Sequence, residues 1–262
     1  MSGFSKEWLA LREPADHAAR ADAVTSAVLS ALPSDLVPTI VDLGCGTGSN
    51  VRYLAPRLHD GRWRLVDDDA VLLSAARESL PYAVDIRTAD LRALDARVLE
   101  GSALVTASAL LDLVSESWLA RLVTMARQAG CAVLMALNYD GRIACTPADP
   151  DDATVRGFVN RHQHGDKGFG PALGPNAGIR AEALLRGAGY TVFRAQSDWV
   201  LRPDDADLQR ELIDGWAFAA TEIAPEHTAR IAGWRTRRQA HVAAGISHLI
   251  VGHDDVGGVL RA

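Results

Sequence analysis

The hydrophobic positions of this chain follow two spacings that alternate regularly between residues 39 and 137. Short apolar runs, typical of buried strands, cover residues 39–41, 63–66, 82–89, 103–107 and 132–137. Between them, apolar residues recur every three or four positions, as on one face of a helix, over residues 51–55, 70–80 and 118–129. Strands and helices in strict alternation predict a parallel sheet with helices on both faces.

The pattern is less regular on either side of this stretch. Residues 8–32 have helical spacing and predict one or two helices ahead of the first strand. Residues 138–176 are rich in Gly, Pro, Asp and His without a clear period, which we interpret as a lid-like insertion. Further on, we expect helices over residues 179–186 and 204–244, the latter interrupted at Pro225, and strands over residues 190–195 and 247–251.

These elements predict one α/β domain over residues 1–262, a three-layer sandwich with helical cap insertions. Its expected parts are an N-terminal helical cap, a ligand-binding core, a lid-like insertion and a second helical insertion, over residues 1–36, 37–137, 138–178 and 204–245.

Composition and charge narrow the class of protein. Hydrophobic residues make up 48% and charged residues 23%, so a sizeable folded core is expected. The net charge is −6 and no basic run is present, which argues against a nucleic-acid partner. The three cysteines form no CxxC pair, so we expect neither a disulfide framework nor a metal site. With no signal-like start and no apolar stretch of membrane-spanning length, we expect a cytosolic protein.

Residues 41–48 read VDLGCGTG and lie between the first strand and the following helix. Glycines at alternating positions there let a ligand approach the backbone closely. A dinucleotide fingerprint would require a glycine at position 49, where the chain has Ser49, so a nicotinamide dehydrogenase is the weakest hypothesis. Asp42 would repel a pyrophosphate, but it suits a cationic amino group such as that of S-adenosylmethionine.

Two further acids follow the next two strands. Asp67 ends the second strand, where a carboxylate can accept hydrogen bonds from ribose hydroxyls. Asp90 ends the third strand, where a carboxylate can accept one from the exocyclic amine of adenine. Because the carboxyl ends of parallel strands meet at one edge, we expect all three acids around one ligand.

The segments VDLGCGTG, LVDDD, TADL and VTASALLDL resemble the class I S-adenosylmethionine-dependent methyltransferases. The resemblance implies a Rossmann-like, mostly parallel seven-stranded sheet with an antiparallel last strand, and S-adenosyl-L-homocysteine as product. It places the methionine part on the glycine loop, the ribose on Asp67, the adenine beside Asp90 and the methyl donor over Ser108. The implied cofactor residues are Asp42, Gly44, Gly46, Gly48, Asp67, Asp90, Leu91, Ser108 and Ala109. Asp68 is an alternative ribose ligand, and Cys45 we interpret as a small filler of the loop.

N-terminal helices often fold over the cofactor in this family, so Arg12 or Arg20 is a candidate partner of the methionine carboxylate. Both arginines are alternatively ordinary surface residues. Asp112, after the fourth strand, either orients or deprotonates the acceptor, or merely caps a loop. Tyr139 and His162 are further catalytic candidates, because both belong to the segment that we expect to face the acceptor. A solvated loop is the alternative for His162.

The main hypothesis is methyl transfer from S-adenosylmethionine to a small, anionic or polar molecule by in-line displacement at O, N or S. One alternative is methylation of RNA or protein, although Ser108-Ala109-Leu110-Leu111 stands where methylation of exocyclic base amines would require Asp/Asn-Pro-Pro-Tyr/Phe. Another alternative is a non-catalytic regulatory protein that binds the cofactor. The oligomeric state stays open.

Overall fold

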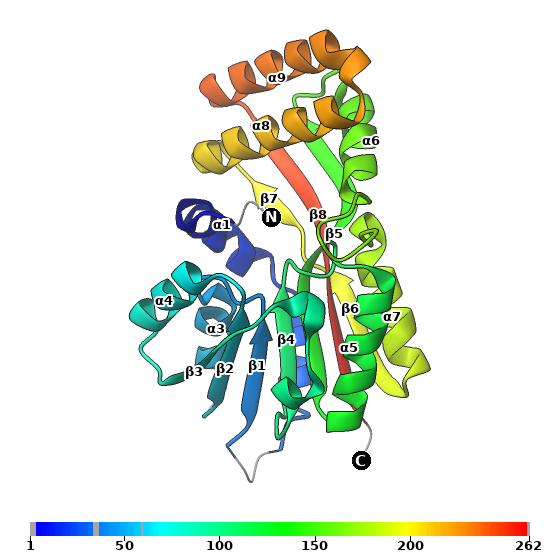
Figure 1. Ribbon diagram of the computed structural model, residues 1–262. Coiled ribbons are helices and arrows are strands. Elements are labelled where there is room, and N and C mark those ends of the chain that lie inside the picture. Colours follow the sequence, from blue (N-terminus) through cyan, green and yellow to red (C-terminus); the bar gives the residue numbers. More distant parts are fainter. Residues whose placement is uncertain (1–3, 34–36, 59, 261–262) are drawn as a thin grey trace.

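One mixed sheet of eight strands organises the chain (Figure 1). The computed structural model describes residues 4–33, 37–58 and 60–260, so residues 1–3 and 34–36 of the predicted N-terminal cap lie outside the described residues. The strand order is β3-β2-β1-β4-β5-β8-β6, and β7 pairs with β8. The strands are β1 (Thr39–Leu43), β2 (Arg62–Asp67), β3 (Val84–Thr88), β4 (Leu104–Ser108), β5 (Ala132–Thr146), β6 (Tyr190–Gln196), β7 (Trp199–Leu201) and β8 (His248–Leu260).

The direction of the strands confirms the predicted fold class. Strands β1 to β5 pair in parallel, whereas β8 runs antiparallel to β5, β6 and β7. The sheet is therefore mostly parallel, with seven strands in line and an antiparallel last strand.

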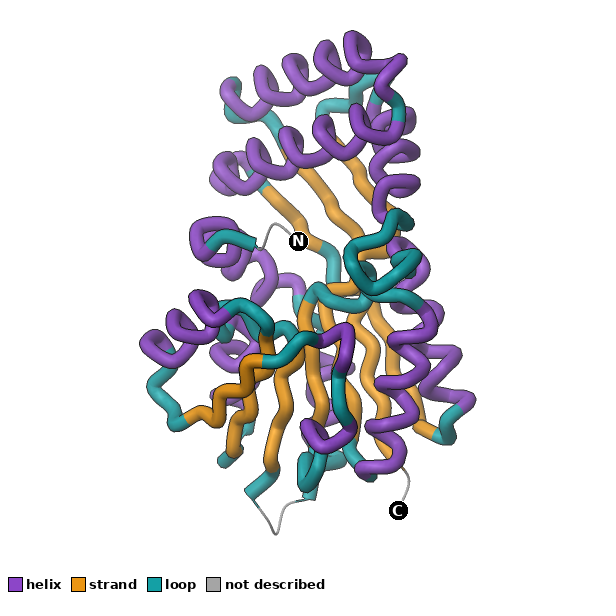
Figure 2. The backbone as a smooth tube through the Cα atoms, in the orientation of Figure 1, coloured by secondary structure: helices purple, strands orange, loops and turns teal. Residues whose placement is uncertain are grey.

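Helices cover both faces of this sheet, as Figure 2 shows. Neighbouring residues of a strand point to opposite faces. Ile40 accordingly packs in the apolar cluster that includes residues of α2, α3 and α4, and Val41 in the cluster that includes residues of α5 and α7. These helices are α2 (Asp22–Leu29), α3 (Ser49–Leu54), α4 (Ala70–Ser79), α5 (Glu116–Ala129) and α7 (Ala177–Gly187). The α/β sandwich is thus built from strands that are apolar on both sides.

A second apolar cluster forms above the sandwich, where β5 and β8 run on beyond their neighbours (Figure 1). We call this part the cap. It consists of the far ends of β5 and β8, strand β7, and helices α6 (Asp152–Gln163), α8 (Ala206–Ile223) and α9 (Thr228–Ala243). Three tryptophans anchor it, namely Trp199, Trp216 and Trp234. Because the cap continues the same sheet, its position relative to the core is fixed by strand pairing.

Two segments differ from the sequence-based expectation. Residues 138–176 are not a long irregular insertion, because β5 continues to Thr146 and α6 follows. Helix α6 escaped prediction because it fully buries only Val155 and Val159. The last strand, β8, is longer than predicted, because the glycines and aspartates in its second half are not typical of a strand. At Gly257, for example, a Cβ atom would lie 2.5 Å from Val28, so only glycine allows α2 to pack there.

A buried ion pair joins the N-terminal helices to the sheet. Asp255 of β8 is fully buried, and its Oδ2 accepts hydrogen bonds from Arg20 Nε at 3.2 Å and from the Ala21 backbone N–H at 3.0 Å. Its Oδ1 accepts one from the backbone N–H of Leu137 in β5 at 2.8 Å. Arg20 follows α1 (Lys6–Ala19), so this carboxylate fixes where α1 leaves the body of the protein.

Replacing Asp255 with Asn should lower the free energy of unfolding by about 3–5 kcal/mol, because it leaves the buried Arg20 charge without its partner. Urea unfolding followed by tryptophan fluorescence measures this loss. Asp204→Asn, at an exposed position, is the matched control and should stay within about 0.5 kcal/mol of the wild type. Equal stabilities of the two variants would contradict a stabilising role for the ion pair.

Candidate functional site

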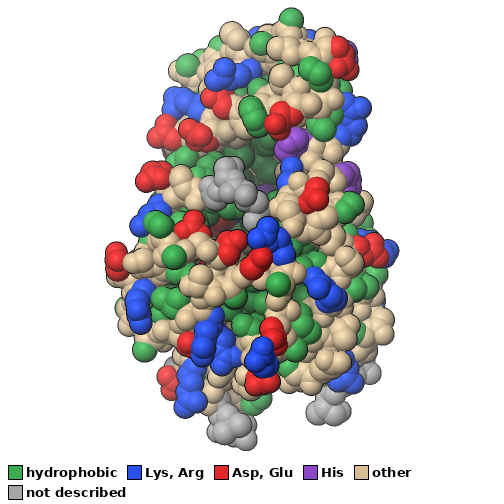
Figure 3. Space-filling model, in the orientation of Figure 1, with side chains coloured by type: hydrophobic (Ala, Val, Ile, Leu, Met, Phe, Trp, Pro, Cys, Tyr) green, Lys and Arg blue, Asp and Glu red, His purple; other side chains and the backbone are tan. Residues whose placement is uncertain are grey.

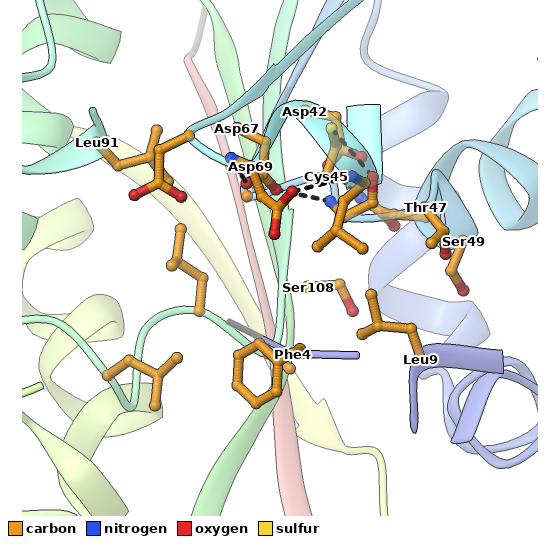
Figure 4. Close-up of a pocket in the computed structure, with 18 of the residues that line it drawn as sticks. Phe4, Leu9, Asp42, Cys45, Thr47, Ser49, Asp67, Asp69, Leu91 and Ser108 are labelled. Atoms are coloured by element: carbon orange, nitrogen blue, oxygen red, sulfur yellow. Dashed lines mark hydrogen bonds between the residues drawn. The ribbon is translucent and has the colours of Figure 1, made fainter. Parts of the chain in front are cut away.

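A pocket of about 500 Å³ opens at the carboxyl ends of β1, β2 and β4. In the space-filling view the molecule is hollowed between the cap and the core, and histidine and basic side chains lie along the rim (Figure 3). Phe4 and Leu9 face the acidic residues across the pocket in Figure 4. The lining residues that carry polar or charged groups include Arg12, Asp16, Asp42, Asn50, Asp67, Asp68, Asp69, Arg92 and Ser108.

The glycine loop forms one wall of this pocket. Gly44 and Gly46 line it, and the backbone N–H of Gly46 donates to Asp67 Oδ2 at 2.8 Å, which ties the loop to the end of β2. Gly48, predicted to line the methionine part, is not among the lining residues. A Cβ atom at Gly48 would lie 3.1 Å from the Leu80 side chain, so this glycine serves the packing of α3 near the end of α4.

Asp42 is buried at the floor of the pocket, where its Oδ1 accepts a hydrogen bond from Asn50 Nδ2 at 2.8 Å. Its Oδ2 has no partner among the described residues, and burial raises the pKa of this carboxyl to about 7. A buried carboxylate oxygen without a donor is costly unless a ligand supplies one. Asp42 therefore offers a site for a cationic or hydrogen-donating group.

Arg20 sits behind Asn50 rather than on the pocket wall. Its Nη1 donates to Asn50 Oδ1 at 2.8 Å, while its buried Nη2 has no partner within the described part of the chain. An unpaired carboxylate oxygen and an unpaired guanidinium N–H thus lie on either side of one asparagine. An amino acid carries the complementary ammonium and carboxylate groups. Arg12, the other predicted partner of a ligand carboxylate, does line the pocket.

The three consecutive acids at the end of β2 have different roles. Asp67 is buried, accepts hydrogen bonds from the backbone N–H groups of Gly46 and Asp69, and has its pKa raised mainly by burial. Asp69 caps α4 by accepting from the backbone N–H groups of the first turn. Asp68 lines the pocket, is exposed, and its carboxylate has no hydrogen-bond partner among the described residues. Both candidate ribose ligands, Asp67 and Asp68, therefore border the pocket.

The remaining predicted cofactor residues are divided. Leu91, Cys45 and Ser108 line the pocket. Burial and the neighbouring acids raise the pKa of the Cys45 thiol, which agrees with a filler and not a nucleophile. Asp90 does not line the pocket: its carboxylate accepts from Arg92 Nε at 2.7 Å, and this hydrogen bond lowers its pKa. A contact between Asp90 and adenine stays a prediction.

The three predicted catalytic residues lie outside the pocket lining. Asp112 is buried with an unpartnered Oδ1, and burial raises its pKa to about 6 although Arg12 and Lys167 oppose the shift. The Tyr139 hydroxyl donates to Asn160 Oδ1 at 2.7 Å. His162 contacts Glu222 and Lys167. Of the three, Asp112 is the one with an unpaired polar atom among the described residues, and a contact with an acceptor stays a prediction.

Sequence patterns named Arg12 but missed its contacts, and they missed His253, between the pocket and the cap. Arg12 binds Asp16 through both Nε and Nη2 and stacks over the Trp199 ring at 5.0 Å. His253 is buried between Tyr139 and Trp199, its Nδ1 has no partner among the described residues, and burial lowers its pKa to about 3. The i,i+4 pair of opposite charges in α1, Arg12 and Asp16, can be recognised in the sequence, but the contacts with distant residues cannot.

In the described part of the chain, no three His, Cys, Asp or Glu side chains are grouped so that they could hold a metal ion. No helix there has the length and apolar character needed to cross a membrane.

Comparison with known proteins relates the chain to methyltransferases. Residues 40–130 match the family described as "Methyltransferase domain". The trans-aconitate 2-methyltransferase of Paracidovorax citrulli is 31% identical over 159 residues, which cover 60% of this chain and 56% of that protein. The trans-aconitate 2-methyltransferase of Azoarcus sp. is 42% identical over 66 residues, which cover 25% and 26%. The chain therefore spans little more than half of one relative and about a quarter of the other.

A solved structure supports the fold assignment. The cyclopropane synthase MmaA2 from Mycobacterium tuberculosis superposes with a TM-score of 0.50 and 14% identity, over 97% of this chain and 94% of that one. At this identity the likeness concerns the fold, which is the Rossmann-like sandwich described above.

The raised pKa of Asp42 predicts a pH-dependent stability of the ligand-free protein. Because the folded state holds this proton more tightly than the unfolded state, the stabilising contribution is lost as pH rises from the ordinary pKa of an aspartate, 3.8, to about 7. Asp42→Asn should remove this loss and raise the free energy of unfolding relative to wild type by about 1–3 kcal/mol at pH 8, but not at pH 4.

Urea unfolding at both pH values checks this prediction, with the exposed Asp68→Asn as the matched control. Equal effects of Asp42→Asn at pH 4 and pH 8 would show that folding does not raise the pKa of Asp42.

Proposed function

We propose that this chain, which belongs to the class I S-adenosylmethionine-dependent methyltransferases, transfers the methyl group of S-adenosyl-L-methionine to a small-molecule acceptor and releases S-adenosyl-L-homocysteine. The observation that carries this proposal is the unpaired Asp42 Oδ2 in the pocket; Arg20 Nη2, unpaired behind Asn50, is the candidate partner of the ligand's second charged group. They match the ammonium and carboxylate at the methionine end of the cofactor. Nicotinamide dinucleotides have no such amino-acid end.

The other lining residues fit the rest of the cofactor. Asp67 and Asp68 supply carboxylate oxygens for the ribose hydroxyls, and Leu91 supplies an apolar contact for the adenine. Leu9 of α1 lies against the glycine loop, because a Cβ atom at Gly46 would be 3.1 Å from its side chain. Helix α1 thus covers the methionine end and shields it from water.

The sulfonium of the bound cofactor supplies a methyl group that is already activated for displacement. The protein must therefore mainly align the acceptor and exclude water, an effect worth roughly 7–11 kcal/mol for well-oriented reactants. Asp112 is the residue that we assign to orienting the acceptor, since its Oδ1 is buried and unpaired. Tyr139 and His162 are already held by Asn160 and Glu222, so we assign them to shaping the site.

We infer that the acceptor is anionic. Both curated relatives are named for trans-aconitate, a carboxylate. The pocket of this chain holds a matching cation, because Arg12 lines it and its Nη1 has no partner among the described residues. Nothing in the described site favours RNA or protein methylation, or cofactor binding without catalysis. A cytosolic location stays a prediction.

Calorimetry should show micromolar or tighter binding of S-adenosylhomocysteine and none of NAD. Asp67→Ala should weaken S-adenosylhomocysteine binding about 10- to 100-fold through the loss of charge-assisted hydrogen bonds. Asp68→Ala is the parallel variant: if it alone weakens binding, the ribose belongs to Asp68. Binding of NAD without S-adenosylhomocysteine would contradict the proposed function.

The pH dependence of turnover should reveal the role of Asp112. An anionic acceptor next to this carboxyl favours its protonated form, which can donate a hydrogen bond. With the donor saturating, kcat/KM for trans-aconitate should fall as pH rises through about 6. Asp112→Asn, a donor at every pH, should lose that dependence, whereas Asp112→Ala should be slow throughout.

Labelled S-adenosylmethionine and product counting measure these rates. A kcat/KM that instead rises through pH 6, together with an inactive Asp112→Asn variant, would identify Asp112 as a base that removes a proton from the acceptor.

A further inference from the structure

The chain contains only two lysines, Lys6 and Lys167, and otherwise uses arginine as its cation. Lys167 lies in the segment between α6 and α7, two positions before Phe169, which lines the pocket, and is half-buried. Lysine differs from arginine in presenting a compact point charge with three donors. Its use at this one internal place raises the question of what its ammonium binds.

The turn that carries Lys167 is well ordered by its own contacts. The Oδ1 atom of Asp166 accepts hydrogen bonds from the backbone N–H groups of Gly168 at 2.6 Å and Gly170 at 3.0 Å. Phe169 packs edge-on against Trp118, with ring centroids 5.7 Å apart, and lines the pocket. Lys167 therefore projects from a turn that is anchored on both sides.

A chain of two hydrogen bonds holds the ammonium. Lys167 Nζ lies 3.2 Å from His162 Nδ1, and His162 Nε2 lies 3.0 Å from Glu222 Oε2. Since an ammonium can only donate, His162 Nδ1 must be the acceptor and Nε2–H the donor to the carboxylate. These two hydrogen bonds connect Glu222 in α8 through His162 in α6 to Lys167 in the turn. They use one of the three donors of Lys167, and the other two have no partner among the described residues.

The charge of Lys167 is not fully compensated. Partial burial lowers its pKa, while Glu222 and Asp112 favour the charged form. Arg12 also acts on Asp112, so two cations from distant parts of the chain influence the same buried carboxyl. Arg12 is already paired with Asp16, whereas no carboxylate among the described residues lies within ion-pair distance of Lys167, so its ammonium can meet an incoming anion.

We propose that Lys167 binds an anionic group of the acceptor, and that His162 and Glu222 are positioning residues that hold its ammonium. This inference rests on the proposed function and names the side of the site that recognises the acceptor. Arg12 and Lys167 would then contact the acceptor from α1 and from the turn, so that a small carboxylate is preferred over a neutral molecule of the same shape.

Amine labelling tests the contact directly, with Lys6 as the internal control. The full chain, saturated with S-adenosylhomocysteine, is acetylated with and without trans-aconitate and each lysine is followed by peptide mass spectrometry. We expect trans-aconitate to slow labelling of Lys167 at least tenfold and to leave Lys6 unchanged. Unchanged labelling of Lys167 would overturn the inference. Failure to bind S-adenosylhomocysteine would instead remove the proposed function on which it rests.

Kinetics of variants separate recognition from a merely structural role. Lys167→Ala should raise KM for trans-aconitate at least tenfold with kcat within about threefold and unchanged affinity for S-adenosylhomocysteine, and Lys167→Arg should restore part of the loss. Glu222→Gln and His162→Leu should raise KM about threefold. His162→Asn, which keeps an acceptor near the Nδ1 position, should do so less. Glu211→Gln, at an exposed position of the same helix, is the control. A fall in kcat and donor affinity without rescue by arginine would overturn the inference.

Discussion

A series of buried hydrogen bonds that starts at Asp255 and ends at Asp42 connects the sheet to the pocket. Asp255 pairs with Arg20, Arg20 donates to Asn50, and Asn50 donates to Asp42. The series joins β8, the N-terminal helices, α3 and β1, and it leaves an unpaired atom at Arg20 and at Asp42. Buried charges of this kind are tolerated only when partners satisfy them. A ligand with an ammonium and a carboxylate would complete the series, so ligand binding and the placement of α1 depend on the same contacts.

The second constraint is the length of β5 and β8. Their extension carries the cap on the same sheet as the core, so the cap and the pocket are parts of one body. The proposed methyl transfer requires such rigidity, because rate enhancement by alignment tolerates little error in distance. Helix α1 closes the site from the other side, where Arg12 and Asp16 meet Trp199 of β7.

The sequence was sufficient to predict the sheet, the glycine loop and the acids after β1 and β2, because these signals lie within short segments. It was insufficient where a residue's role depends on a distant partner. Asn50 belongs to no recognisable motif, and its role depends on its hydrogen bond with Arg20, 30 positions away. Arg12 is held at the pocket by Asp16, and Asp16 in turn accepts a hydrogen bond from Trp199, which lies 183 positions further along the sequence. The prediction ended the last strand at residue 251, because Asp254, Asp255 and the glycines beyond it are not typical of a strand, although both aspartates are buried. Gly48 fits the glycine motif but packs against Leu80.

The most direct test of the donor site compares two ligands that differ only at the amino-acid end. Calorimetry of S-adenosylhomocysteine and of 5′-methylthioadenosine, which lacks that end, should give an affinity at least about 100-fold higher for S-adenosylhomocysteine, since two charge-assisted contacts are at stake. The Asp42→Asn variant should reduce this difference strongly. Equal affinities for the two ligands in the wild type would contradict the assignment of Asp42 and Arg20 to the methionine end.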